Sequence, residues 1–183
     1  MDGLVLENPI VERVLQSHRA VLGPDFDGYR HHVYRVASFF NGLGPARLTS
    51  NPALPIAAAF HDLGIWVDHT FDYLEPSARL ARAYLAAQGL ADVDPDLVHE
   101  LIVQHHKLSR YRQTAPWAAL VEQWRQADLV DVSLGMVRFG LPYRYVREVQ
   151  RHLPDCGFHR RLLSLTLREF VRRPWRPLPM MRW

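Results

Sequence analysis

The feature that most constrains this chain is a polar pair inside an apolar stretch, Ala57-Ala58-Ala59-Phe60-His61-Asp62-Leu63-Gly64. The alanines and the phenylalanine favour a buried helix, and Gly64 is typical of a helix end. His61 and Asp62 would then face an apolar interior, where an unpartnered polar group is costly. Two interpretations follow. The pair caps the helix and forms a salt bridge, or it binds a divalent transition metal, because imidazole and carboxylate are both good ligands.

Helical periodicity extends over most of the 183-residue chain, because apolar residues recur at spacings of three and four. Residues 65–75 show no clear period and are predicted to form an ordered loop. The sequence contains no alternating strand pattern, internal repeat or linker. Helices are predicted over residues 8–22, 29–41, 53–63, 76–88, 95–108, 115–133, 143–153 and 157–172. These patterns predict an all-α fold, a single-domain helical bundle over residues 1–183.

Composition narrows the class of protein. The chain is 48% hydrophobic and 22% charged, which argues against disorder. Its net charge of +3 comes almost wholly from arginine, since Lys107 is the only lysine, and this weak excess suits a small anionic substrate. Cys156 is the single cysteine, so no intramolecular disulfide can form. The sequence shows neither a signal peptide nor an apolar run of about 20 residues, so we expect a cytoplasmic protein without a membrane span.

Several predicted helices carry a histidine or aspartate where an apolar residue would be expected. His32, the His61-Asp62 pair, His105 and Asp128 each lie in phase with the apolar stripe of a different helix. A single buried histidine is usually a core residue with satisfied hydrogen bonds. Four helices that each present a metal-type ligand instead favour a shared site, provided that the fold brings them together.

The segments around these residues resemble the motifs of the HD-domain superfamily of metal-dependent phosphohydrolases. The matching segments are His32-Val33-Tyr34-Arg35-Val36, Ala59-Phe60-His61-Asp62-Leu63-Gly64 and Ala127-Asp128-Leu129-Val130-Asp131, with a fourth feature in Ile102 followed by His105. That family has a histidine on one helix, a His-Asp dyad on a second and an aspartate on a later helix. The separations here, 29 residues from His32 to His61 and 66 from Asp62 to Asp128, suit this order. The motif core covers about residues 29–133, and residues 143–183 hold C-terminal helices and a tail.

The resemblance implies that His32, His61, Asp62 and Asp128 bind one divalent metal, with Mn, Fe, Co, Ni and Zn all open. His31 competes with His32 for the first position, and Asp131 competes with Asp128 for the last. His105 is expected beside the metal or the substrate, and His106 at the surface.

Two departures from the family pattern bear on activity. Ile65 stands where members resembling 5′-deoxynucleotidases carry a glutamate three residues after the dyad. Two-metal members, such as the oxygenases, have another histidine about twenty residues after the dyad, and residues 76–90 contain none. A single ion is therefore expected, although a di-iron oxygenase, other non-phosphate chemistry on the HD scaffold and a non-catalytic metal-binding regulatory module remain alternatives.

The expected reaction is hydrolysis of a small phosphate ester, such as a nucleotide, by a metal-activated water. Asp62 and His105 are the candidates for orienting that water and moving its proton. Phosphoryl transfer also needs positive groups around the phosphate oxygens. Arg35, Lys107, Arg110 and His69 are the candidates for binding the substrate; solvated surface pairs are the alternative for the basic residues.

The C-terminal tail is basic and apolar at once. Residues 168–183 hold five arginines, at 168, 172, 173, 176 and 182, together with Pro174, Pro177 and Pro179, which end any helix. Trp175, Met180 and Trp183 add apolar surface. We expect the tail to pack on the protein's own helices or on the partner in a homodimer. A polyanion-binding arm would carry more lysines, so nucleic acid is not expected as a partner.

Overall fold

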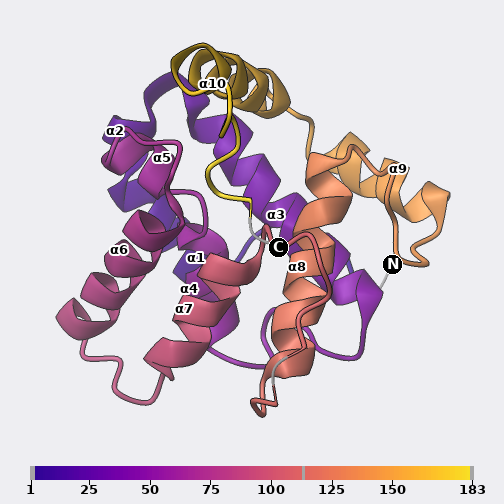
Figure 1. The fold of residues 1–183 in the computed structure, drawn as a ribbon. Coiled ribbons are helices and arrows are strands. Elements are labelled where there is room, and N and C mark those ends of the chain that lie inside the picture. Colours follow the sequence, from indigo (N-terminus) through magenta and orange to yellow (C-terminus); the bar gives the residue numbers. More distant parts are fainter. Residues whose placement is uncertain (1–2, 113, 182–183) are drawn as a thin grey trace.

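The computed structural model describes residues 3–112 and 114–181, and these residues form helices without any strand (Figure 1). Eight of the helices have eight residues or more, and α2, α5 and the 3-10 helix η1 are single turns. The elements are α1 (Pro9–Ser17), α2 (Arg19–Leu22), η1 (Gly23–Asp25), α3 (Phe26–Leu43), α4 (Ala53–Phe60), α5 (Gly64–Val67), α6 (Leu74–Ala87), α7 (Pro95–Gln104), α8 (Ala118–Val132), α9 (Tyr143–His152) and α10 (Phe158–Arg172). The all-α prediction is confirmed.

Two predicted helix starts are formed by side-chain caps. The Asn8 carboxamide oxygen accepts hydrogen bonds from the backbone N–H groups of Ile10 and Val11, and Pro9 opens α1. Asp94 caps α7 in the same way, with Pro95 as its first residue. The helix predicted over 8–22 is interrupted at His18, where α1 gives way to the single turn α2.

Helices α3 and α4 form the centre of the bundle. Helix α3 packs against α8 over much of its length, and α4 packs against α1 and α7 (Figure 1). Every residue of α4 is buried, which agrees with its run of alanines. One continuous hydrophobic core spans the helices from α1 to the start of α10. Polar residues on α3 and directly after α4 therefore have to find their partners inside the protein.

Gly64 serves close packing and does not stop a helix. It opens α5, its N–H donates to Ser77 Oγ at 2.9 Å, and a Cβ there would lie 2.8 Å from the Tyr73 carbonyl oxygen. A glycine is required because the start of α6 passes so near the backbone. The prediction that residues 65–75 form only a loop is wrong for 65–67, which belong to α5, and for 74–75, which begin α6.

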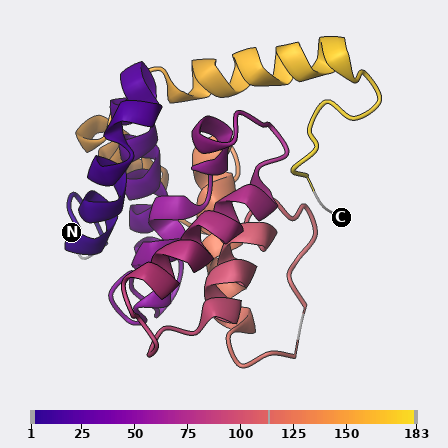
Figure 2. The same cartoon turned by 90° about the vertical axis from the view of Figure 1, so that its left-hand side faces the viewer.

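The C-terminal part lies across one end of the bundle. Figure 2 shows α10 spanning that end, with the tail returning toward the segment that follows α7. Phe158 is the buried residue of α10. In the tail, Met180 is 4% exposed and joins the core, whereas Trp175 is 84% exposed; Arg182 and Trp183 lie outside the described residues. Within the described chain, no helix is long and apolar enough to cross a bilayer.

Candidate metal centre

Four helices bring histidine and aspartate side chains to one buried point. His32 projects from the middle of α3, His61 and Asp62 follow the last turn of α4, His105 follows α7, and Asp128 lies on α8. All five side chains are buried, although each could ionise or accept a hydrogen bond. The helices predicted from the sequence therefore meet where the shared-site interpretation required.

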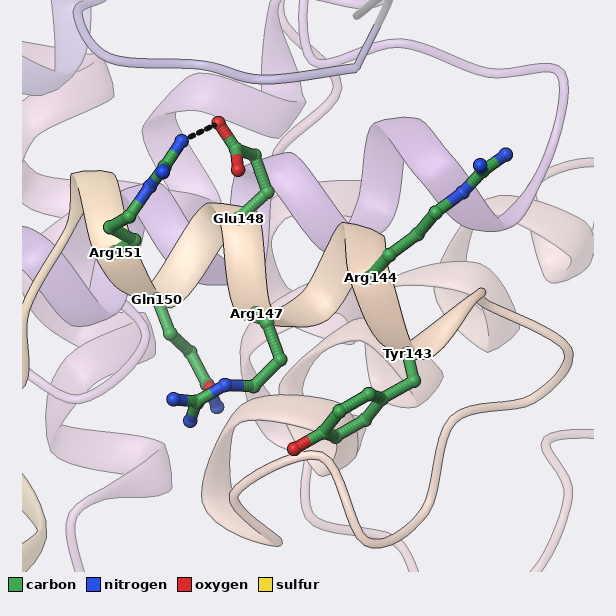
Figure 3. A pocket seen from close by; sticks show the side chains of 6 residues that line it. All are labelled: Tyr143, Arg144, Arg147, Glu148, Gln150 and Arg151. Atoms are coloured by element: carbon green, nitrogen blue, oxygen red, sulfur yellow. Dashed lines mark hydrogen bonds and ion pairs between the residues drawn. The ribbon is translucent and has the colours of Figure 1, made fainter.

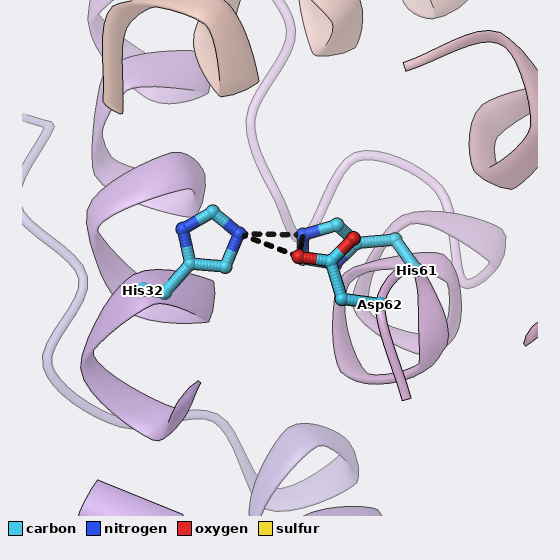
Figure 4. A group of neighbouring side chains, drawn as sticks. All are labelled: His32, His61 and Asp62. Carbon is cyan, nitrogen blue, oxygen red and sulfur yellow. Dashed lines mark hydrogen bonds and ion pairs between the residues drawn. The ribbon is translucent and has the colours of Figure 1, made fainter. Parts of the chain in front are cut away.

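The distances within this cluster suit ligands of one ion. His32 Nε2 lies 2.8 Å from His61 Nε2 and 3.3 Å from Asp62 Oδ2 (Figure 4). His61 Nε2 lies 3.6 Å from the same Asp62 oxygen. Asp128 Oδ1 completes the group at 3.7 Å from His32 Nε2 and 4.0 Å from His61 Nε2. Two nitrogens and two carboxylate oxygens are thus within reach of a single divalent cation.

The hydrogen bonds of the histidines set their tautomers. His61 Nδ1 donates to the Ala58 carbonyl oxygen at 2.8 Å, and His105 Nδ1 donates to the Ile102 carbonyl oxygen at 2.5 Å. His32 Nδ1 lies 2.7 Å from Asp131 Oδ2, a carboxylate oxygen that accepts its N–H. Each neutral ring therefore turns an Nε2 lone pair into the cluster. Lone pairs of His32 and His61 would repel at 2.8 Å, so a proton or a cation has to lie between them.

Buried polar atoms without hydrogen-bond partners also indicate a cation site. Asp62 Oδ1, His105 Nε2 and both carboxylate oxygens of Asp128 are buried without a hydrogen-bond partner. His105 Nε2 does approach Asp62 Oδ1 to 3.2 Å, yet the pair lacks hydrogen-bond geometry. Buried polar atoms are almost always satisfied, so an orphaned set of this size indicates a ligand. The donor set fits a divalent cation.

The charges and the pKa values describe a site that favours a cation. Burial acts to lower the pKa of His32, but the hydrogen bonds that His32 donates to Asp131 and Asp62 outweigh it and raise that pKa to about 9. Burial, above all, lowers the pKa of His61 to about 4 and keeps its ring neutral. Burial opposes ionisation of Asp62, yet His61 and His105 hold the pKa of Asp62 well below 3.8.

The buried carboxylates outnumber the cations that face them. Asp62, Asp128 and Asp131 are all buried here, and Arg35 is the guanidinium paired with them. With the histidines neutral, as metal binding requires, three carboxylates against one guanidinium leave an excess of two negative charges, which a divalent ion would neutralise.

Arg35 and Asp131 form a support behind His32. Arg35 Nε lies 2.5 Å from Asp131 Oδ1, and Arg35 Nη2 lies 2.9 Å from Asp131 Oδ2, while Arg35 Nη1 donates to the Leu153 carbonyl oxygen. Phe158 stacks on the His32 ring with centroids 4.1 Å apart. A carboxylate on the far nitrogen of a metal-binding histidine fixes its orientation and basicity. The structure thus places Arg35, expected at the substrate, on the far side of His32.

The alternatives left open by the sequence are separated by geometry. Asp128 faces the cluster, whereas Asp131 faces His32 Nδ1 and Arg35. His31 Nδ1 lies 2.8 Å from the Pro154 carbonyl oxygen, so its ring points toward the chain before α10. His32 and Asp128 are therefore the members of these pairs that reach the cluster.

His106 is the residue that sequence reasoning missed. It was expected at the surface, but its side chain is only 8% exposed, and its Nδ1 lies 3.1 Å from Asp128 Oδ2. Its Nε2 lies 2.6 Å from the Tyr73 hydroxyl. The prediction is wrong because α7 ends at Gln104, so residues 105 and 106 leave the helical phase. The signal in the sequence that could have identified His106 is the pair of adjacent histidines near the end of this helix.

The other residues that were expected to bind the substrate differ in their exposure to solvent. His69 is exposed in the loop after α5, with a φ of 51°. Arg110 is exposed and lines a hollow of about 580 Å³ beside Gln123 of α8. Lys107 is half-buried, and its carbonyl oxygen accepts from Arg125 Nη1 at 3.0 Å. Nothing in these positions tests a role in substrate binding, which stays a prediction for each.

Two further hollows lie on the side of α9. One, of about 580 Å³, is lined by residues of α9, among them Arg151, which pairs with Glu148 at 2.6 Å. Figure 3 shows the side chains that line it. Another, of about 310 Å³, has Arg35, Asp131 and Arg147 among its lining residues. This second hollow borders the two residues behind His32 and does not include the candidate ligands.

Comparison with protein-family models, with curated proteins and with solved structures gives no match to this chain. The described residues form an all-helical bundle around a buried His/Asp group that could hold a metal ion.

Proposed function

We propose that the protein is a metal-dependent phosphohydrolase that cleaves a small phosphate ester, such as a nucleotide. One observation carries the proposal: the Nε2 atoms of His32 and His61 lie close to one another and to carboxylate oxygens of Asp62 and Asp128, in a buried, negatively charged cluster. The order of these residues along the chain resembles the HD-domain superfamily, and the all-α fold supports that resemblance.

His32, His61, Asp62 and Asp128 would hold the ion. When bound, a divalent metal supplies a water of lowered pKa and polarises a phosphoryl oxygen. His105 Nε2 has no hydrogen-bond partner and lies 3.2 Å from Asp62 Oδ1. Its lone pair would take up the proton of an attacking water. Asp62 would hold the charged imidazolium that results, so the two residues act as one acid–base pair.

Three residues are candidates for contacting the substrate because of their positions in the chain. Lys107 directly follows the two histidines at the end of α7, and His69 and Arg110 lie on the loops that flank Tyr73 and His106 in sequence. These three residues would meet the anionic group of the substrate. Arg35 acts through Asp131 and is a positioning residue. A small anionic substrate, a cytoplasmic setting and a homodimer stay predictions.

Metal content and substrate turnover together test the proposal. Full-length protein would be stripped with a chelator, reloaded separately with Mn, Fe, Co, Ni and Zn, and assayed for phosphate release from a panel of phosphate esters. Asp62→Asn should abolish metal binding and phosphate release while helicity is kept. Asp72→Asn, an exposed loop carboxylate, is the matched control.

Three results would contradict it. Full metal content in the Asp62 variant rejects the ligand assignment. Two irons with oxygen consumption and no phosphate release favour an oxygenase on the same scaffold. A loaded protein that turns over no ester and consumes no oxygen favours a regulatory metal-binding module.

A further inference from the structure

Helix α10 presents an apolar face that the described part of the chain leaves uncovered. Its first residue, Phe158, is buried, and Leu162 and Leu165 pack partly against the core. Because each helical residue turns by about 100°, a second apolar set lies on roughly the opposite side of α10. This set, which we call the outer face, consists of Leu163, Leu167, Phe170 and Val171, and its members are 54% to 83% exposed.

The position of α10 leaves the outer face accessible. Figure 2 shows this helix along one end of the bundle, with the other long helices on one side of it. A flat surface can therefore approach α10 from outside the bundle. Trp175, three residues beyond the helix, is 84% exposed and adds an aromatic side chain. A contiguous exposed apolar surface of this kind marks a site of interaction.

Positive charge accompanies the outer face. Residues 158–181 contain six arginines and a single acidic residue, Glu169. Three of these arginines pair with carboxylates of the chain. Arg168 and Arg172 are exposed on the polar flank of α10 and form no ion pair with any described residue. A surface that complements α10 is therefore apolar inside and anionic at its boundary.

We propose that α10 binds peripherally to an anionic lipid bilayer, with the outer face among the acyl chains near the surface. A helix with large apolar side chains on one face and arginines beside it lies in the plane of the membrane interface. Arg168 and Arg172 would reach the phosphate headgroups, because the long arginine stem can extend out of the apolar layer. This inference goes beyond the proposed hydrolase and does not depend on the metal centre.

Charge and shape favour a bilayer over two other occupants. A two-fold contact between copies of the chain joins the same surface patch on both, so it would set the arginines of one α10 against those of the other. A nucleic acid would match the arginines, but its phosphates would leave Leu163 and Leu167 without an apolar partner. An anionic bilayer satisfies both the apolar and the charged part of the helix.

Co-sedimentation of the full-length protein with vesicles tests the inference. One set of vesicles contains phosphatidylcholine alone, and the other contains equal parts of phosphatidylcholine and phosphatidylglycerol. The protein should bind the mixed vesicles and not the neutral ones, and added salt should weaken binding. Leu167→Gln should lower the partition coefficient about 10-fold, because one leucine is no longer transferred from water. Leu6→Gln, at an exposed leucine before α1, is the matched control.

The contribution of charge is measured with a second pair of variants. Arg168→Gln should lower binding to the mixed vesicles about fivefold and reduce its salt dependence. Arg144→Gln is the matched control, since Arg144 is also exposed and free of ion pairs with described residues, but lies on α9. Circular dichroism checks that each variant folds, and Val171→Gln provides a second variant of the outer face.

Several results would overturn the inference. They are the absence of vesicle binding by the unaltered protein, equal binding to both kinds of vesicle, and unchanged binding by the Leu167 and Arg168 variants. A dimer in sedimentation that Leu167→Gln converts into monomers would assign the outer face to a second copy of the chain. Salt-sensitive binding to duplex DNA, without binding to vesicles, would assign the arginines to nucleic acid. Phosphate release in solution is judged separately.

Discussion

Arg35 reaches the buried His/Asp cluster only through Asp131. Its Nε and Nη2 atoms lie 2.5 and 2.9 Å from the two oxygens of Asp131, and Asp131 Oδ2 also accepts the N–H of His32 Nδ1. All three side chains are buried. The chain therefore uses one carboxylate to neutralise a buried arginine and to hold a histidine with its Nε2 turned toward the cluster.

Asp131→Asn should weaken both stability and metal binding. It leaves the Arg35 charge buried without its partner, so the free energy of unfolding should fall by about 3 kcal/mol. Loss of the support behind His32 should lower metal affinity about 10- to 100-fold. Urea unfolding and metal titration measure the two effects. Asp155→Asn is the matched control, since Asp155 lies 4.0 Å from Arg35 and is 43% exposed. Equal effects in both variants would contradict the special position of Asp131.

The Glu122–Arg125 pair predicts a pH-dependent stability. Burial would raise the pKa of Glu122, but hydrogen bonds from Arg125 and the Tyr111 N–H outweigh it and hold that pKa below 4.5. A depressed carboxyl pKa stabilises the fold above the unfolded value and loses this effect as the pH falls through the folded value. Glu122→Gln should therefore destabilise the protein at pH 7 and progressively less below pH 4.5.

Denaturant unfolding between neutral and acid pH would measure this difference. Glu7→Gln serves as the control at an exposed position. A Glu122 variant whose stability deficit is constant with pH would show that the pair contributes through packing alone.

Gly64→Ala should destabilise the junction between α5 and α6. The new Cβ would lie 2.8 Å from the Tyr73 carbonyl oxygen and 3.0 Å from the Ser77 nitrogen, both backbone atoms that cannot rotate away. A shift of α6 should cost about 1–3 kcal/mol in unfolding free energy. Gly44→Ala is the comparison, because there the nearest atoms belong to the Gln123 side chain. A smaller loss at Gly64 than at Gly44 would contradict the close-packing role.

The tail should contribute through Met180 and not through Trp175. Met180→Ala removes a buried side chain and should cost about 2–3 kcal/mol, whereas Trp175→Ala, at 84% exposure, should change stability by less than about 0.5 kcal/mol. Thermal unfolding compares the two variants. Deletion of residues 174–183 should lower the melting temperature or change the oligomeric state in sedimentation. Unchanged melting and sedimentation, with lost binding to anionic lipid or nucleic acid, would favour a polyanion arm.

Much of the secondary structure could be predicted because its causes are local. Asn8-Pro9 and Asp94-Pro95 begin helices through contacts within two or three residues, and apolar spacing located α3 and α8. The end of α7 at Gln104 was missed. Because the helix ends there, the direction of the His106 side chain could not be predicted from helical periodicity.

The sequence by itself determined that a buried His-Asp pair had to find partners, and it offered the correct helices for them. Only the tertiary structure decided between neighbours such as Asp128 and Asp131, which are both buried on α8. They lie three residues apart, so a small rotation of the helix exchanges their roles. That rotation is set by packing of α8 against α3, a contact between segments about a hundred residues apart. Local pattern therefore names the candidates, and long-range packing selects the aspartate that faces the cluster.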